Sequence, residues 1–305
     1  MDRKHFQIPE EKKKRFILNT DAKNEVDDQF AIVHALLTES FDLRGIIAAH
    51  FGELKSLHSM EDSYDEIMKL LALMDWKEET RVEKGAKHAL PDENTPEDSA
   101  GARLIIEEAM KDDPRPLYVA FLGPLTDMAS ALLLEPEIAE KDIKVIWIGG
   151  GPWPSGDSEY NLKNDIVAAN VIMKSKLELW QIPRNVYRMM PVSYATMAKR
   201  VAPYGEIGRY LVENVIAHNN KSVTGPSEYR VLGDSPAIGV MLYEDCGRWQ
   251  WKPAPEFDAQ MKYVHTGKNR PIKVYETIDD YFIMEDFYAK LQDYVESSKD
   301  APSKE

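Results

Sequence analysis

Four carboxylates crowd into a short stretch near the start of the chain, directly after an apolar run. They lie within residues 19–28 and are Asp21, Glu25, Asp27 and Asp28. A bare carboxylate at the end of a buried strand is costly to desolvate, and converging carboxylates repel one another unless one is protonated or a cation lies between them. Carboxylate oxygens are hard ligands that suit calcium or magnesium better than zinc. The stretch therefore predicts a metal site.

Helix capping is an alternative explanation for part of this cluster. Asp27 or Asp28 would satisfy free backbone N–H groups and the dipole of a following helix, but capping does not account for Asp21. An EF-hand does not fit the spacing. With Asp21 as the first ligand, the third position is Lys23 and the twelfth is Ile32, where a bidentate glutamate is required.

The elements that must position these acids alternate between short apolar runs and longer segments of helical period. Strands are expected at residues 16–18, 43–51, 117–122, 145–148 and 177–182. Helices are expected over residues 30–37, 67–74, 125–134, 204–218, 236–243 and 279–295, around 104–106, and from 165 onward. The alternation predicts an α/β fold, a mostly parallel central sheet flanked by helices on both faces. In such sheets ligands bind beyond the carboxyl ends of the strands.

The length and composition indicate one large domain. The 305 residues are 43% hydrophobic, enough for a large core, and contain no Gly/Ser-rich or Pro-rich linker. We therefore expect a single domain over residues 1–305, with a frayed charged tail at about 297–305. The 38 Lys and Arg against 52 Asp and Glu give a net charge of −14, which opposes binding to nucleic acid because phosphates are repelled.

The sequence also indicates a compartment. No apolar run approaches the roughly 18 residues of a membrane-spanning helix, and the charged start of the chain is not followed by the apolar stretch of a secretory signal. The one cysteine, Cys246, cannot form an internal disulfide, which suits a reducing environment. These features predict a cytoplasmic protein that does not contact membranes.

The segment that carries the acids resembles the N-terminal motif DxDPGxDDAxAI of the inosine/uridine-preferring nucleoside hydrolase family. Residues 19–32 read NTDAKNEVDDQFAI. Five later segments are similar to family motifs in the same order: KGAKHAL at 84–90, LGPLTDMA at 122–129, IGGG at 148–151, EYNLKND at 159–165 and GDSPAIGV at 233–240. Each segment alone is weak, and taken singly the glycines read as turns. The resemblance runs from Asn19 to Val240, and the joint order makes it specific.

The resemblance implies a calcium-dependent hydrolase of N-glycosidic bonds in ribonucleosides or related N-ribosides, with a small-molecule nucleoside as its substrate. It implies that Asp21, Asp28, Asp234 and the backbone carbonyl of Leu122 hold the calcium ion. Asp21 would also act as general base on a calcium-bound water. By analogy with the family, the protein would be a homo-oligomer.

The resemblance further implies that Asp27, Glu159 and Asn161 bind hydroxyl groups of the ribose. Vicinal ribose hydroxyls are oxygen ligands that can complete the coordination sphere of calcium. Cleavage of an N-riboside also develops oxocarbenium character on the sugar, as in other glycoside chemistry. The acids would therefore serve an uncharged substrate.

The chain departs from the family pattern on the side of the leaving base. The residue before Asp234 is usually histidine, a plausible acid toward the base, but here it is Gly233. The loop after Asp21 is two residues longer than in the family, and the asparagine after the second strand has no clear match. His50, at a strand end, and Trp153, after the triple glycine, are the candidates for replacing part of this function.

Two other classes of protein stay open at this point. One is a non-catalytic nucleoside- or ribose-binding protein that kept the metal site and lost the acid for the leaving group. The other is a metal-dependent phosphohydrolase that uses the same acids. The second is disfavoured because the expected crevice has no evident Arg/Lys phosphate clamp, although Lys23 and Lys163 lie in the matched segments.

Overall fold

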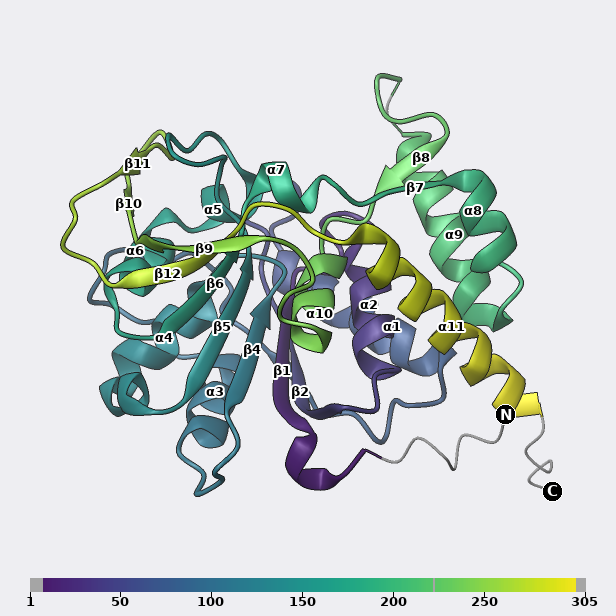
Figure 1. Ribbon diagram of the computed structural model, residues 1–305, viewed down its shortest axis with the longest axis horizontal. Helices are drawn as coiled ribbons and strands as arrows, with labels where there is room; N and C mark the ends of the chain where they lie inside the picture. Colours follow the sequence, from purple (N-terminus) through teal and green to yellow (C-terminus); the bar gives the residue numbers. More distant parts are fainter. Residues whose placement is uncertain (1–7, 222, 300–305) are drawn as a thin grey trace.

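An eight-stranded sheet forms the centre of the protein in the computed structural model, which describes residues 8–221 and 223–299 (Figure 1). The strand order is β3-β2-β1-β4-β5-β6-β12-β9. The strands are β1 (Lys14–Thr20), β2 (Phe41–Ala48), β3 (Val82–Lys84), β4 (Leu117–Phe121), β5 (Ile143–Ile148), β6 (Glu178–Ile182), β9 (Trp249–Pro253) and β12 (Pro271–Tyr275). Neighbouring strands are parallel except that β9 runs antiparallel to β12 at the edge.

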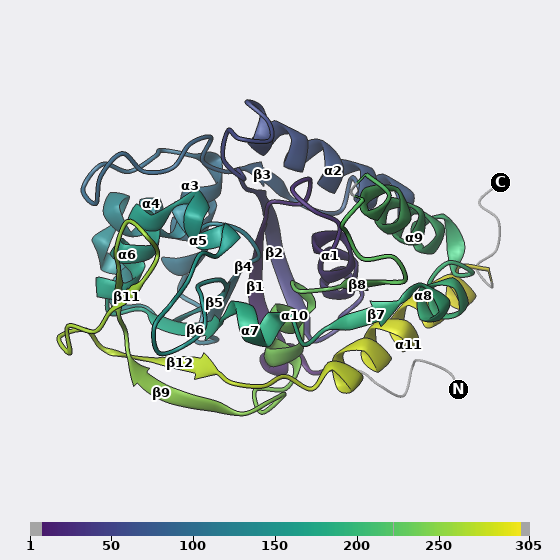
Figure 2. The same ribbon diagram turned by 90° about the horizontal axis from the view of Figure 1, so that it is seen from above.

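Helices cover both faces of the sheet. They are α1 (Asp28–Leu36), α2 (Ser59–Leu73), α3 (Ala100–Ala109), α4 (Thr126–Leu134), α5 (Tyr160–Asn164), α6 (Ile166–Lys174), α7 (Arg184–Tyr187), α8 (Tyr194–Arg200), α9 (Gly205–Asn219), α10 (Ser235–Leu242) and α11 (Asp280–Lys299). Two short 3-10 helices are η2 (Glu10–Lys12) and η3 (Pro136–Glu140), and two small ribbons pair β7 (Pro191–Ser193) with β8 (Tyr229–Val231) and β10 (Glu256–Phe257) with β11 (Tyr263–Val264). Figure 2 shows α3, α4 and α6 on one side of the sheet and α1, α10 and α11 on the other. The predicted α/β fold with helices on both faces is confirmed.

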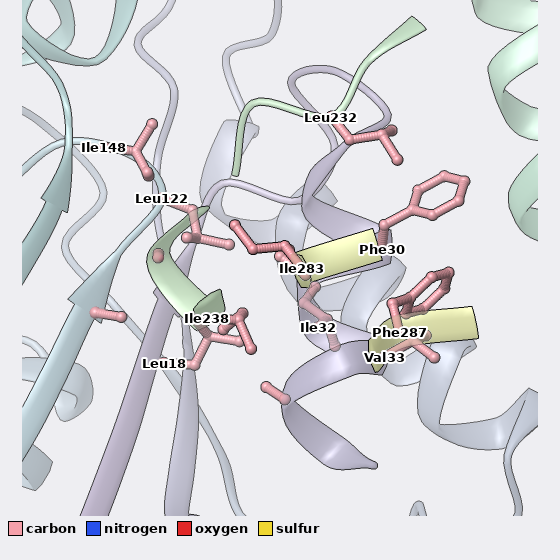
Figure 3. Packing of buried hydrophobic residues seen from close by; sticks show 14 of the residues in the cluster. Leu18, Phe30, Ile32, Val33, Leu122, Ile148, Leu232, Ile238, Ile283 and Phe287 are labelled. Atoms are coloured by element: carbon pink, nitrogen blue, oxygen red, sulfur yellow. The ribbon is translucent and has the colours of Figure 1, made fainter. Parts of the chain in front are cut away.

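The central strand β1 shows why the sheet is buried on both faces. Successive side chains of a strand point to opposite faces. Accordingly Leu18 belongs to the apolar cluster under α1, α2, α10 and α11, whereas Ile17 belongs to the cluster under α3, α4 and α6. Figure 3 shows Leu18 beside Ile238 of α10, with Phe30 of α1 nearby. Continuous burial of β1 explains its unbroken apolar run.

The order of the strands fixes where a ligand can bind. The chain leaves β1 for β2 and β3 on one side and then crosses to β4, β5 and β6 on the other. The strand order therefore reverses between β1 and β4, which are adjacent parallel strands. In open α/β sheets the loops at such a switch point part from each other and leave a crevice at the carboxyl ends of the strands. The loops after β1 and β4 line that crevice.

The second half of the chain departs from the sequence-based expectation in two places. Strands β12 and β9 extend the sheet beyond β6 and were not predicted; β9 is an edge strand whose residues are all exposed or half-buried. Helix α11 continues to Lys299, so part of the expected frayed tail is helical, and residues 300–305 lie outside the described part of the chain. Among the described helices, none is both long enough and apolar enough to cross a membrane.

Candidate active site

A pocket opens at the carboxyl ends of the central strands and collects most of the predicted site residues. Its lining comes from the segments after β1, β4, β5 and β6 and from the turn before α10. The lining residues are Asp21, Asn24, Glu25, Asp27, Asp28, Leu122, Ile148, Glu159, Tyr160, Asn161, Tyr187, Gly233 and Asp234. Seven of the nine residues predicted from the sequence lie here, and His50 and Trp153 do not. Residues more than two hundred positions apart in the sequence thus meet in one pocket.

Aspartates from the loop after β1 and from the turn before α10 meet in the pocket. Carboxylate oxygens of Asp27, Asp28 and Asp234 all lie within 4.8 Å of one another, a grouping that could hold a metal ion. Asp28 also accepts a hydrogen bond from the Thr20 hydroxyl at 2.6 Å. Asp21 lies in the same pocket but outside this closest trio, whereas the family resemblance groups Asp21, and not Asp27, with Asp28 and Asp234.

Burial and mutual repulsion make this cluster costly in the absence of a cation. Burial, reinforced by the charge of Asp28, raises the pKa of both Asp21 and Asp234 well above the usual range. Burial and the neighbouring Asp27 raise the pKa of Asp28 to about 7. Each of these three side chains belongs to a residue that is no more than 6% exposed. Within the described part of the chain no ion pair reaches any of them, so ionising all three is costly unless a cation lies nearby.

Asp27 differs from the other three aspartates because it has a cationic partner. Its carboxylate accepts a hydrogen bond from the backbone N–H of Gly233 at 2.9 Å and lies 3.5 Å from the Arg230 guanidinium. Arg230 also pairs with Glu25. Burial first, and then Glu25, raise the pKa of Asp27 to about 6, and Arg230 opposes that shift.

Asp21 is held by a residue that the sequence analysis did not single out. The side-chain amide of Asn24 donates a hydrogen bond to Asp21 Oδ2 at 3.0 Å. Asn24 is in turn fixed by Lys55, whose ammonium group donates to Asn24 Oδ1 at 2.6 Å. On the other side, a Cβ atom at Gly123 would lie 2.9 Å from Asp21 Cγ, so a glycine is required where β4 ends. Asn24 could have been selected from the sequence, because it is a polar residue in the lengthened loop that follows Asp21.

Asn161 ties together the ends of two strands beside the acids. Its side-chain amide donates to the backbone carbonyl of Leu122 at 2.6 Å and to that of Ile148 at 2.8 Å. Leu122 directly follows β4 and Ile148 ends β5. The Leu122 carbonyl, predicted as a metal ligand, therefore lies on the pocket wall in a position that Asn161 defines.

Glu159 caps helix α5 from inside the pocket. Oε2 accepts hydrogen bonds from the backbone N–H groups of Gly150 at 2.9 Å and Leu162 at 2.8 Å. Oε1 accepts from the N–H of Asn161 at 3.1 Å and from the Tyr187 hydroxyl at 3.0 Å. Gly150 has a φ of +83°, a left-handed conformation that favours glycine. Burial raises the pKa of Glu159, and these hydrogen bonds oppose that shift.

His50, predicted from the sequence to replace part of the leaving-group acid's function, lies outside the pocket. Its Nε2 atom is 2.8 Å from the Thr126 hydroxyl, which donates onward to Asp165 at 2.7 Å. Because the Thr126 proton points to Asp165, His50 Nε2 acts as the donor to Thr126. His50 lines a separate depression with Gly52 and Glu53, and burial lowers its pKa to about 4. A neutral, buried imidazole bonded to Thr126 is not placed to protonate a base in the acidic pocket.

Trp153 is likewise engaged elsewhere. Its indole N–H donates to Gln181 Oε1 at 2.9 Å, and its ring packs edge-on against Tyr263 with ring centroids 5.0 Å apart. The sequence analysis missed Tyr187, which does line the pocket. Tyr187 lies in α7, which follows β6. The expectation that ligands bind beyond the carboxyl ends of the strands could therefore have selected it as well.

Comparison with known proteins agrees with this fold. The sequence pattern of the inosine-uridine preferring nucleoside hydrolase family matches residues 16–281. This match spans most of the chain, and the protein belongs to that family.

Individual relatives are distant. Probable uridine nucleosidase 2 of Arabidopsis thaliana is 26% identical over 131 residues, which are 42% of this chain and 40% of that protein. The inosine-uridine preferring nucleoside hydrolase of Crithidia fasciculata is 30% identical over 93 residues, 29% of this chain and 28% of that protein. The chain thus matches less than half the length of either relative.

Solved structures agree over nearly the whole chain. A purine-preferring ribonucleoside hydrolase from Gardnerella vaginalis superposes with a TM-score of 0.76, at 20% identity, over 93% of this chain and 100% of its own. A structure described as inosine-guanosine nucleoside hydrolase gives a TM-score of 0.70, at 18% identity, over 93% and 98%. At these identities the likeness establishes the shared fold.

Proposed function

We propose that the protein is a calcium-dependent hydrolase of N-glycosidic bonds in ribonucleosides or related N-ribosides. The observation that carries the proposal is the set of three buried carboxylates, Asp21, Asp28 and Asp234, that have no cationic partner within the described residues and share one pocket. Family membership supports the choice of a nucleoside as substrate. A neutral sugar suits the pocket, because no lysine or arginine is among its lining residues.

The donor set of the pocket fits a hard divalent cation. Asp28 and Asp234 would hold it together with Asp21 and the carbonyl oxygen of Leu122. All of these donors are oxygens, and calcium accepts six to eight oxygen ligands, which leaves positions for a sugar diol. When bound, the cation would lower the pKa of a water molecule and neutralise the carboxylate cluster.

The chain's own side chains have distinct roles in the proposed reaction. Asp21 accepts a proton from the attacking water, because its carboxylate faces the pocket and Asn24 holds its orientation. Asp27, Glu159 and Asn161 bind ribose hydroxyls. Asp27 is suited to this because the Gly233 N–H and Arg230 already stabilise its carboxylate.

A second candidate is a nucleoside- or ribose-binding protein without catalytic activity. The observation in its favour is that Gly233 has no side chain and that the pocket lining contains no histidine, lysine, arginine or cysteine. A metal-dependent phosphohydrolase is disfavoured for a related reason, since a phosphate has no cationic side chain to bind in this lining.

Incubation with a panel of purine and pyrimidine ribonucleosides separates these functions. The enzyme is expected to release free base and ribose with calcium present and to stop when a chelator removes it. If calorimetry shows tight binding of a nucleoside but no free base is released, the protein is a nucleoside-binding protein and not a hydrolase. Hydrolysis of ribose phosphates alone would favour the phosphohydrolase.

Two further proposals concern the state of the protein in the cell. We infer a homo-oligomer from the family resemblance, and analytical ultracentrifugation tests it. We infer a cytoplasmic location because the only cysteine, Cys246, is buried and unpaired, and fractionation of cells tests it.

A further inference from the structure

The pocket offers few groups that can donate a hydrogen bond to a departing base. Cleavage of an N-riboside sends an electron pair to the base nitrogen, so a donor beside that base accelerates the reaction. The neutral donors in the lining are the amides of Asn24 and Asn161 and the phenols of Tyr160 and Tyr187. The Asn24 amide bonds Asp21, and the Asn161 amide bonds two backbone carbonyls. The two phenols remain, because a phenol O–H can rotate from one acceptor to another, whereas the two amides orient the proposed base and the strand ends.

The ring of Tyr187 occupies the space beside Gly233. A Cβ atom at position 233 would lie only 3.0 Å from Tyr187 Cδ2 and 3.3 Å from Asp27 Oδ2. A larger side chain at this position would therefore collide with the ring. Gly233 directly precedes Asp234, so the Tyr187 ring forms the pocket wall next to the carboxylate cluster.

Helix α7 holds Tyr187 against the loop that carries Glu159. The backbone N–H of Arg184 donates to the Gly150 carbonyl at 2.9 Å, and its guanidinium pairs with Asp157 at 2.8 Å. The Tyr187 hydroxyl donates to Glu159 Oε1 at 3.0 Å. These contacts place the Tyr187 ring at the pocket surface before any substrate enters, while its hydroxyl can still rotate to another acceptor.

The two phenols lie beside different acids. Tyr160 lies on the side of Asp21, the proposed base, because the Lys55 ammonium group lies 4.6 Å from its ring centroid and also bonds Asn24, the partner of Asp21. Tyr187 donates instead to Glu159, and its ring lies beside Gly233, the residue before Asp234. A base that activates water and a donor that assists the leaving group act on opposite sides of the bond that breaks. Tyr187 is therefore the better placed donor.

We propose that Tyr187 donates a hydrogen bond to the departing base and so determines which leaving groups the enzyme accepts. This inference rests on the hydrolase function proposed above. In the reaction the C1′–N bond breaks with its electron pair going to the base nitrogen, the oxygen of water bonds to C1′, and a water proton passes to Asp21. The phenol turns from Glu159 to the base and keeps its proton, and the base gains a proton through solvent.

The test compares two kinds of riboside with the Tyr187→Phe variant. Uridine and inosine need help at the leaving base, whereas 4-nitrophenyl β-ribofuranoside releases a stable phenolate that needs none. The variant keeps the ring against Gly233 and removes only the hydroxyl. We expect kcat/KM for the nucleosides to fall on the order of 100-fold and that for the aryl riboside to change by less than about threefold.

The matched control is Tyr210→Phe, which removes another hydroxyl-to-carboxylate hydrogen bond, that to Glu66, outside the pocket. It should leave the ratio of the two rates at the wild-type value. An equal loss of kcat/KM on both substrates in Tyr187→Phe would show that the phenol only positions Glu159. No loss on either substrate would show that the phenol has no role in catalysis. Both results overturn this proposal and leave the proposed hydrolase function intact. A wild-type protein that cleaves neither substrate would overturn the hydrolase function as well.

Discussion

The amide of Asn24 donates a hydrogen bond to Asp21 Oδ2 at 3.0 Å, and both residues belong to the same loop after β1. The backbone N–H of Asn24 also bonds the Asp21 carbonyl at 2.8 Å, which closes the loop into a turn. The lengthened loop therefore supplies its own orienting group for the proposed base. A carboxylate that accepts a proton during catalysis needs such a partner to keep its orientation.

Replacing Asn24 with alanine should lower nucleoside hydrolysis by about 10- to 100-fold, because Asp21 loses the donor that orients it. The free energy of unfolding should also fall, by about 1–3 kcal/mol, because the buried Asp21 carboxylate loses a hydrogen-bond donor. Steady-state kinetics and thermal unfolding of Asn24→Ala measure both effects. Asn94→Ala, at an exposed position, is the control. Wild-type kinetics in Asn24→Ala would show that the Asp21 carboxylate does not depend on this contact.

Calcium should stabilise the protein more at neutral pH than in acid. In the metal-free protein, burial with Asp27 raises the pKa of Asp28 to about 7, and burial with Glu25 raises that of Asp27 to about 6. The folded state then binds more protons than the unfolded chain between about pH 4 and pH 7, so the free energy of unfolding falls as pH rises through that window. A cation removes this loss because it stabilises the ionised carboxylates.

Thermal unfolding with calcium and with a chelator checks this prediction. The difference between the two midpoints should widen from about pH 5 to about pH 8, since stabilisation by a ligand rises with the logarithm of its affinity and the carboxylates bind the cation only when ionised. An Asp234→Asn variant should lose most of the difference. A gap that is the same at both pH values would mean that these aspartates do not take up the cation.

His50→Ala should reduce stability and leave hydrolysis within about threefold of wild type, because His50 bonds Thr126 and does not line the acidic pocket. Loss of a buried hydrogen-bond partner should lower the free energy of unfolding by about 1–3 kcal/mol. Chemical denaturation and kinetics measure the two quantities on the same sample. A loss of about 100-fold in kcat at unchanged stability would instead restore His50 as the catalytic acid expected from the sequence.

The strands that could be predicted from the sequence are those that are buried along nearly their whole length. The strands β1, β4, β5 and β6 are covered on both faces, so their apolar runs were visible in the sequence. Strand β9 has no such run because it lies at the sheet edge, and its residues are mostly exposed or half-buried. Its pairing with β12 depends on tertiary contacts that a local pattern does not encode.

The site residues selected from the sequence also divide into those that lie in the pocket and those that do not. Asp21 and Leu122 each follow a strand and match a family motif, whereas Asn161 was selected from its motif alone, and the structure brings all three to one pocket. His50 also follows a strand but lines a separate depression. Its direction depends on the Thr126 hydroxyl, a partner 76 positions away that the sequence pattern does not reveal. Position at a strand end therefore predicts proximity to the crevice but not the direction of the side chain.

Asp21→Asn should abolish hydrolysis, with a fall in kcat on the order of 1,000-fold, because an amide cannot accept the proton of the attacking water. The substitution keeps the size of the side chain, so the protein should fold as before. Calcium affinity should also weaken. Kinetics and calcium titration of Asp21→Asn and of the exposed-site control Asp92→Asn measure these effects. Full activity in Asp21→Asn would exclude this residue as the base.

The most direct measurement is a crystal structure of the protein soaked with calcium and ribose, recorded with anomalous scattering. The account predicts one ion at about 2.3–2.6 Å from oxygens of Asp21, Asp28, Asp234 and the Leu122 carbonyl, with two ribose hydroxyls completing its coordination. An anomalous map without a peak between these residues, or ribose bound away from them, would contradict it.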